Sequence, residues 1–375
     1  MHSRYTQLLV GLMISLTFGF GLWARGLEPL WGDLTRMGWR SENDFGWTVP
    51  KERFQPLAAE VGALDRHYDV VAIGDSFTGE SRWRPGTSWP HYLAHDTGLK
   101  VGIFDRDFDL LGRLLASPGF AADPPSVVIY EVVERHLAQS NPWPADTACP
   151  TAAEPPHVTL TQGLPSAPPI EDRRRTERYW NELPVSYGLA YLERNALRAL
   201  IGHETTEAVE LDLARGGLFS SRQDRKLLVY GEDFNKLGWT EAQWRGAACS
   251  LLSLQARVEA NGRTLFLAMV APDKLTAYGP YLADAPFRGI SRLDLVAVPG
   301  LNLVRFDQGF EPTEHIDLYL PDDTHWSTVG HALAAKLVER KLRALGALPP
   351  LAASLSAPAD DPNTDPDRSA PPENR

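Results

Sequence analysis

The stretch that decides the fold class is residues 69–77, which read DVVAIGDSF. Residues 69–73 form a β-rich apolar run, and a Gly-Asp-Ser turn follows it at once. Catalytic and binding groups of an open α/β sheet gather at the carboxyl ends of its strands. Ser76 therefore stands where a parallel sheet would carry its chemistry, at the end of the first regular strand.

The chain around this stretch alternates strands with helices. Further strands are predicted at residues 100–104, 126–133, 264–270 and 301–306, and helices at residues 90–97, 109–116, 185–201, 240–262 and 327–345. The run SVVIYEVV at 126–133 is apolar on both faces, as in a strand that is covered from both sides. The alternation predicts an α/β domain whose parallel sheet has helices on both faces.

Two of these helices carry further signals. Thr240 and Gln243 have the spacing of a capping box, which marks the start of a helix. In the helix at 185–201, an apolar stripe is predicted from residues at helical spacing: Leu189, Leu192, Ala196 and Leu200.

The N-terminus predicts a membrane anchor. Residues 6–24 carry no charge, are mostly apolar and follow Arg4, and about 20 such residues span a bilayer as a helix. The run GLWARG at 21–26 is a poor cleavage site, so residues 1–25 are expected to be an uncleaved signal anchor. A cleaved signal peptide is the alternative, and in both cases the rest of the chain would lie across the membrane.

Composition shifts divide the remaining chain. Residues 26–64 are rich in Trp, Gly and Arg without strong periodicity, and we interpret them as an N-terminal extension. The catalytic domain is expected at 65–346, with a long loop insertion rich in Pro, Ala, Thr and charged residues at 138–180. Residues 347–375 are dominated by Pro, Asp, Ala, Ser and Asn and are predicted to be a disordered tail.

Bulk composition excludes some classes of protein. The 375 residues are 43% hydrophobic, which suffices for a full core, and a net charge of −11 argues against nucleic-acid binding. Cys149 and Cys249 are the only cysteines; an oxidising compartment would let them pair, and a lone Cys249 would suit a helix core. The chain has no Cys-x-x-Cys spacing, and no metal or other cofactor is expected.

Ser76 and His325 are the candidate active-site pair. A serine hydroxyl becomes nucleophilic when a neighbouring base takes its proton, and a histidine base needs a carboxylate that orients it. His325 lies in the run PDDTHW at 321–326, where Asp322 and Asp323 both precede it closely enough to reach its Nδ1. The plainer alternatives are a serine that caps a turn and a solvated loop histidine.

Other residues carry weaker signals. Lys274 and Tyr278 follow the strand at 264–270 and could line the cleft or be plain loop residues. Trp326 could stack on a sugar ring or pack beneath the last helix. His91 and His95 are one helical turn apart, but without a third ligand they are interpreted as helical surface histidines and not as a metal site.

Together these motifs resemble the SGNH (GDSL-type) hydrolase superfamily, and in particular its AlgJ/AlgX-like polysaccharide O-acetyltransferase branch. The stretches that carry the resemblance are GDSF at 74–77, SWPHYLAHDTG at 88–98, SVVIYEVVERHL at 126–137, APDKLTAYGPYL at 271–282 and DTHW at 323–326. They cover most of residues 65–345. The serine precedes the Asp-x-His motif here, as in ordinary SGNH enzymes, whereas the alginate proteins have the reverse order.

The resemblance implies a flavodoxin-like parallel sheet and a Ser-His-Asp site. Ser76 would be the nucleophile and His325 the base, with Asp323 as the acid by the branch's Asp-x-His pattern and Asp322 as the fallback by the wider Asp-x-x-His pattern. Asp75, Glu134 and Arg135 join Lys274, Tyr278 and Trp326 as candidates for oxyanion or substrate contacts. An ion pair between Arg135 and Glu131 or Glu134 is the alternative for that arginine.

The resemblance also implies a function, namely transfer of acetyl groups to an exported polysaccharide on the periplasmic side of the inner membrane. The expected partners are the polysaccharide acceptor, a multi-span membrane acyltransferase that delivers the acetyl group, and the membrane itself through the N-terminal helix. A carbohydrate acetyl-esterase and a non-catalytic polysaccharide-binding or assembly protein on the same fold are the alternatives.

Overall fold

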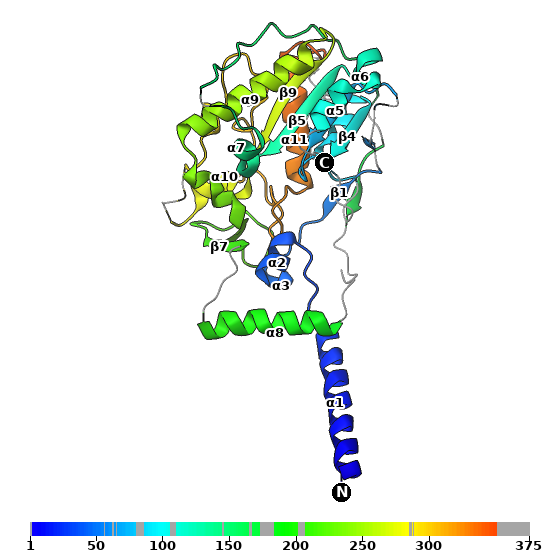
Figure 1. Cartoon of the computed structure of the whole chain (residues 1–375), viewed down its shortest axis with the longest axis vertical. Helices are drawn as coiled ribbons and strands as arrows, with labels where there is room; N and C mark the ends of the chain where they lie inside the picture. Colours follow the sequence, from blue (N-terminus) through cyan, green and yellow to red (C-terminus); the bar gives the residue numbers. More distant parts are fainter. Residues whose placement is uncertain are drawn as a thin grey trace, which may run out of the picture.

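A six-stranded parallel sheet forms the centre of the protein (Figure 1), in the order β10-β9-β5-β3-β4-β2. The computed structural model describes residues 2–55, 57–61, 64, 66–79, 86–105, 110–144, 146–164, 167–172, 184–201, 207–284, 287 and 289–350. The strands of the sheet are β2 (Ala59–Glu60), β3 (Val70–Gly74), β4 (Val101–Asp105), β5 (Val127–Val133), β9 (Leu265–Ala271) and β10 (Leu303–Val304). All five strands predicted from the sequence are present, and the two-residue β2 adds one edge.

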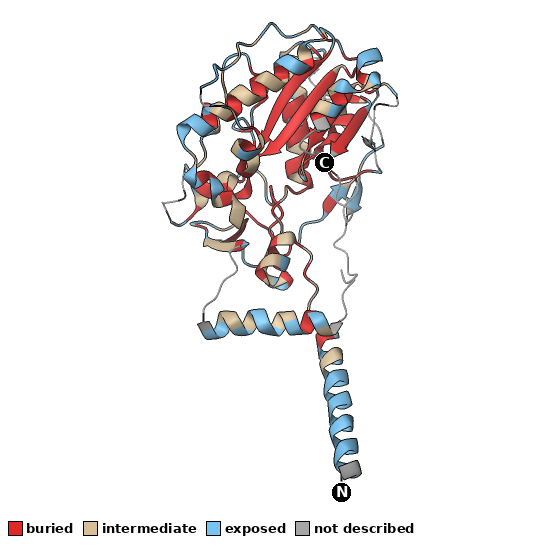
Figure 2. Cartoon of the chain, viewed as in Figure 1, coloured by how far each residue is buried: buried red, intermediate tan, exposed pale blue. Residues whose placement is uncertain are grey.

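Helices cover both faces of this sheet, as the alternation of strands and helices predicts. Every residue of the three central strands β3, β5 and β9 is buried, which Figure 2 shows as a continuous buried layer. One face packs against α4 (Trp89–Thr97) and α11 (Thr328–Ala344), and the other against α5 (Leu110–Ala116), α6 (Pro118–Ala122) and α9 (Glu241–Glu259). Because helices cover both faces of the sheet, these strands are apolar throughout and do not alternate between apolar and polar residues.

Local sequence determines where the two long packed helices begin. Thr240 and Gln243 form the predicted capping box at the start of α9. The Ser327 side chain accepts a hydrogen bond from Val329 N and caps α11. By contrast, the apolar stripe of α8 (Pro184–Ile201) does not join the core, because Leu189, Leu192 and Leu200 are exposed.

The N-terminal extension contains structure that its lack of periodicity does not predict. It forms α2 (Asp33–Gly38), α3 (Glu42–Phe45), β1 (Lys51–Arg53) and β2. Leu34 of α2 and Phe45 of α3 share a small core with Ala208 and Leu228 of the hairpin β7 (Ala208–Asp212) and β8 (Lys226–Tyr230). This hairpin is not among the elements predicted from the sequence.

The predicted loop at 138–180 is tied to the body at several points. Cys149 and Cys249 form a disulfide that joins the loop to α9, and Leu160 N donates to the carbonyl of Ala347. Strand β6 (Ile170–Asp172) pairs with β1. Ala347 and Leu348 belong to the core, so the prediction that the disordered tail begins at residue 347 is wrong. Residues 351–375 of that predicted tail, and Asp109 at a predicted helix start, lie outside the described residues.

The remaining elements lie mostly near the carboxyl edge of the sheet. They are η1 (Glu134–His136), α7 (Leu137–Ser140), η2 (Gly231–Gly238), α10 (Lys274–Tyr278), η3 (Gly279–Tyr281) and η5 (Leu293–Leu295). Helix α1 (His2–Arg25) projects from the body with most of its apolar side chains exposed (Figures 1 and 2), and residues 4–25 are long and apolar enough to cross a membrane.

Candidate active site

A tight turn after β3 presents Ser76. A Cβ at Gly74 would lie 2.2 Å from Thr78 Oγ1 and 2.4 Å from Glu131 Oε2, so glycine is required there. The Asp75 carboxylate accepts hydrogen bonds from Phe77 N (3.1 Å) and from Val133 N (3.0 Å) at the end of β5. These bonds hold the turn against the sheet and leave Ser76 exposed at its tip.

His325 connects Ser76 to a carboxylate. Its Nε2 lies 2.6 Å from Ser76 Oγ, and its Nδ1 lies 2.6 Å from Asp323 Oδ1. The same Asp323 oxygen accepts from His325 N at 3.0 Å. Ser76 and His325, 249 positions apart in the sequence, are thus brought together with Asp323 in the geometry that a nucleophile, a base and an orienting acid would need.

The charges of nearby carboxylates make the His325 imidazole more basic. Burial favours neutral imidazole, but Asp323, through its charge and its hydrogen bond, and Asp33, through its charge, outweigh that effect. The pKa of His325 is therefore raised above its usual 6.5. A base with a raised pKa accepts the serine proton more readily, provided that the solution pH keeps the imidazole neutral.

Asp33 is a fourth member of the site that sequence reasoning missed. Its Oδ2 lies 3.6 Å from His325 Nδ1, its Oδ1 accepts from Thr324 N at 2.7 Å, and its own N–H donates to Asp323 Oδ2 at 3.4 Å. Burial and the neighbouring Asp323 raise the pKa of Asp33 to about 7. A lone acid in a segment without periodicity carries no local signal, because only the fold brings it to the histidine.

The N-terminal extension contacts the loop that carries Asp323 and His325, because the first residues of α2 donate hydrogen bonds to the backbone of that loop. Leu34 N and Thr35 N both donate to the carbonyl of Asp322, at 3.1 and 3.2 Å. A Cβ at Gly32 would lie 1.8 Å from that same oxygen, so a larger residue cannot occupy the position without moving the backbone. The side chain of Asp322 is itself buried, and Asp323 is the residue in contact with His325.

Lys274 supports the loop from inside the protein. Its ammonium donates to the carbonyls of Leu320 (2.7 Å), Pro321 (3.0 Å) and Asp323 (3.0 Å), and the side chain is fully buried. Burial lowers the pKa of Lys274 to about 8, against the opposing charges of nearby carboxylates. The prediction that Lys274 lines the cleft is therefore wrong.

Tyr278 and Trp326 are also core residues. Tyr278 is fully buried and its hydroxyl accepts from Tyr319 N. Trp326 is 1% exposed and packs edge-on against Phe77, with ring centroids 4.9 Å apart. The interpretation of Trp326 as a sugar-stacking ring is wrong, because the ring is buried in the core against Phe77, the residue next to Ser76. The alternative, that Trp326 is a packing residue, is confirmed.

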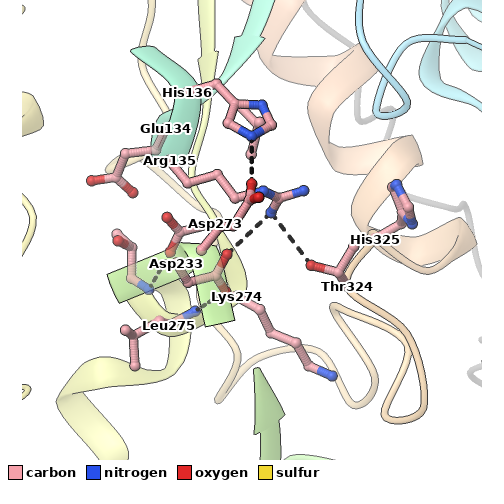
Figure 3. A network of polar contacts seen from close by, with 12 residues as sticks. Glu134, Arg135, His136, Asp233, Asp273, Lys274, Leu275, Thr324 and His325 are labelled. Atoms are coloured by element: carbon pink, nitrogen blue, oxygen red, sulfur yellow. Dashed lines mark hydrogen bonds and ion pairs between the residues drawn. The ribbon is translucent and has the colours of Figure 1, made fainter. Parts of the chain in front are cut away.

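A buried ionic network surrounds Arg135 (Figure 3), whose guanidinium lies between Asp233 and Thr324. Its Nη1 is 3.1 Å from Asp233 Oδ1 and 3.4 Å from Thr324 Oγ1. Burial opposes the charge, but Asp233 and other carboxylates raise the pKa of Arg135. The partner of this arginine is Asp233, and neither Glu131 nor Glu134 is among its contacts in the described part of the chain.

The two glutamates of β5 and η1 have other partners. Glu131 Oε2 accepts from Asp75 N (3.0 Å) and from Thr78 Oγ1 (2.9 Å), so it supports the serine turn. Glu134 is buried beside Lys236, with 3.4 Å between Oε2 and Nζ, and burial raises its pKa. An acid inside an otherwise apolar strand is the signal that could have marked Glu131.

Among the described residues, the group whose donor atoms could hold a metal ion coincides with the Asp323–His325 pair. Asp33, Asp323 and His325 bring ligand atoms within 4.8 Å of one another, but the His325 Nδ1 is engaged by Asp323. His91 is fully buried and its Nδ1 accepts from Leu57 N and Ala58 N, at 3.0 Å each. It is therefore a structural residue of α4, and the interpretation of His91 as a surface histidine is wrong.

Comparisons with protein-family models, with curated proteins and with solved structures found no match for this chain.

Proposed function

We propose that the protein is an SGNH-type O-acetyltransferase that acetylates an exported polysaccharide through an acyl-enzyme on Ser76. The observation that carries this proposal is the chain of two 2.6 Å contacts from Ser76 Oγ through the His325 ring to Asp323. It lies at the carboxyl edge of a parallel sheet, where such enzymes hold their catalytic groups.

The order of the main strands supports the SGNH fold. Counting from β3 along the chain, β4-β3-β5-β9-β10 has the order 2-1-3-4-5. This is the flavodoxin-like order of doubly wound sheets, with helices on both faces. The serine after the first of these strands and the histidine before the last helix match the arrangement expected of the superfamily.

The first half-reaction forms the acyl-enzyme. His325 Nε2 takes the Ser76 proton as Oγ attacks the acetyl carbonyl, and Asp323 stabilises the imidazolium that results. The Ser76 N–H has no intramolecular partner among the described residues, so it is free to donate to the oxyanion. When the tetrahedral intermediate collapses, the donor's oxygen leaves with the proton from His325.

The second half-reaction releases the acetyl group. A sugar hydroxyl gives its proton to His325 Nε2 and attacks the ester carbonyl, and collapse of the intermediate returns the proton to Ser76 Oγ. Arg135 contributes by holding Thr324, the residue between the acid and the base. A role of Arg135 as an oxyanion donor stays a prediction.

The compartment and partners belong to the same proposal. Helix α1 would anchor the chain in the inner membrane with the catalytic body in the periplasm, where a disulfide such as Cys149–Cys249 persists. Acetyl-coenzyme A does not occur outside the cytoplasm, so a multi-span membrane acyltransferase would supply the acetyl group.

The test is acetyl transfer by the full chain in detergent, from a chromogenic acetyl ester to an oligosaccharide acceptor. We expect acetylated sugar with the wild type and a loss of at least about 1,000-fold in Ser76→Ala. The melting temperature of Ser76→Ala should stay unchanged, because the side chain is exposed. Full activity in Ser76→Ala would contradict a catalytic role and favour the non-catalytic alternative.

An acetyl-esterase is the second candidate. The observation that favours it is the exposure of Ser76, since water has free access to an ester formed there. The same assay separates the two functions. If the rate of acetate release does not fall when the oligosaccharide acceptor is added, the protein is an esterase. If acetylated sugar forms and acetate release falls, the protein is a transferase.

A further inference from the structure

Helix α8 carries an apolar stripe that nothing in the described chain covers. Leu189, Leu192 and Leu200 are 58%, 45% and 81% exposed, and they recur at helical spacing along one side of the helix. A row of exposed leucines on a soluble surface is unfavourable and marks an interaction site.

The opposite side of α8 is fixed to the protein, which determines where the stripe points. The Tyr187 hydroxyl donates to the carbonyl of Glu28 at 2.9 Å, and Tyr187 packs against Trp39 with ring centroids 5.4 Å apart. Arg198 donates to the carbonyls of Gly38 and Trp39. With these contacts made, the leucine stripe faces away from the catalytic body.

The same helix is joined to the end of α1. Gly188 lets the two helices approach closely, since a Cβ there would lie 2.8 Å from the Ala24 Cβ and 3.0 Å from the Phe20 ring. Trp23 also contacts Tyr191, with 6.2 Å between ring centroids. In Figure 1, α8 runs crosswise to α1 at the base of the body, and Figure 2 shows exposed surface along both.

Helix α1 has the dimensions of a membrane span. Its residues 4–25 would extend about 33 Å, close to the thickness of the hydrocarbon core. Trp23 and Arg25 stand at the end that meets α8, and aromatic and basic residues are common at the level of the lipid headgroups. In a bilayer spanned by α1, a helix that runs crosswise to α1 at this end would lie at the membrane surface.

We propose that α8 is an interfacial helix that lies in the headgroup layer of the membrane spanned by α1, with its leucine stripe in the lipid. The chemistry fits, because an amphipathic helix binds a bilayer by burying its apolar side at the boundary of the acyl chains. This inference rests on the proposed membrane span of α1 and does not depend on the proposed catalytic activity.

The arrangement would hold the active site at a set distance from the bilayer. Arg198 of α8 binds the end of α2 at Gly38, and Asp33 at the start of α2 contacts the His325 loop. One short helix thus separates the interfacial helix from the catalytic histidine.

The test places a fluorescent probe on α8 of the full chain in nanodiscs of phosphatidylcholine and phosphatidylglycerol. Leu192→Cys is labelled with nitrobenzoxadiazole under non-reducing conditions, so that the Cys149–Cys249 disulfide does not react. Leu237→Cys on η2 is the matched control, since Leu237 is 51% exposed on the catalytic body. Leu12→Cys, at a leucine 56% exposed on α1, reports on the span itself.

We expect lipids with a doxyl quencher to reduce the emission at positions 12 and 192 by at least about twofold and to leave position 237 unchanged. Quenching at 12 but not at 192 would overturn the proposal and favour a protein partner or a second copy on the stripe. Quenching at neither position would also overturn it, because α1 would not span the bilayer. Quenching at all three would show that the whole body touches lipid, which contradicts a role specific to α8.

Discussion

At the scale of single residues, two adjacent aspartates have opposite surroundings. Asp323 is partly exposed and contacts the His325 ring. The Asp322 side chain is fully buried, and the backbone carbonyl of Asp322 accepts hydrogen bonds from Leu34 N and Thr35 N of α2. The backbone of the loop points successive side chains in different directions, so of the two only Asp323 contacts the imidazole.

This difference predicts unequal effects of matched substitutions. We expect Asp323→Asn to lower kcat for ester cleavage by about 100- to 10,000-fold, because the neutral amide cannot stabilise the imidazolium. Asp322→Asn has nearly the same shape and should retain most of the activity. The check is steady-state kinetics beside the melting temperature of each variant. A larger loss in a folded Asp322→Asn would assign the acid to Asp322.

The raised pKa of His325 predicts how activity depends on pH. Because the neutral ring is the active base, kcat/KM should rise with pH and level off above a pKa higher than 6.5. The charge of Asp33 contributes to that raised value, so Asp33→Asn should move the rising limb toward lower pH.

The matched control for this shift is Asp294→Asn, which neutralises an exposed carboxylate on η5 and should leave the profile unchanged. If the apparent pKa of the kcat/KM profile is the same in Asp33→Asn as in the wild type, the Asp33 carboxyl is uncharged when His325 titrates.

At the scale of elements, the loop that carries the acid and the base depends on one lysine. Lys274→Met would leave three buried carbonyls without their donor, and we expect it to lower the free energy of unfolding by about 2–4 kcal/mol. Urea denaturation measures the change. Lys336→Met on α11 is the control, because Lys336 is exposed and should change stability by less than about 0.5 kcal/mol.

The contact between α2 and this loop depends on a glycine. Gly32→Ala would push α2 away from the Asp322 carbonyl, and we expect kcat/KM to fall by about tenfold or more as the loop shifts. Gly238→Ala is the control, since a Cβ there meets nothing within 4 Å. Equal kinetics of the two variants would mean that the extension does not position the active site.

At the scale of the whole molecule, the disulfide Cys149–Cys249 closes a loop of the chain across 100 residues. We expect the double variant Cys149→Ser, Cys249→Ser to be less stable by about 2–4 kcal/mol, because its unfolded state is less restricted. Denaturation with and without a reductant measures this. The reductant should lower the stability of the wild type to that of the variant and leave the variant unchanged; no effect on the wild type would contradict the pairing.

Much of this molecule was determined by its local sequence. Continuous apolar runs, in place of the alternating pattern of a strand covered on one face, predicted the central strands. The Thr240–Gln243 capping box predicted the start of α9. Ser76 and His325 were identifiable because each stands beside turn or acid residues at the edge of a regular element. Information of this kind lies within a few residues and needs no knowledge of the fold.

Other features were decided only by tertiary structure, because they depend on which surfaces meet. The sequence placed Lys274, Tyr278 and Trp326 near the site but could not tell whether they faced solvent, and all three are buried. Asp33 joins His325 from 292 residues away through the docking of α2, for which no local pattern exists. The sequence predicted the leucine stripe of α8, but only the contacts on its other side turned that stripe outward.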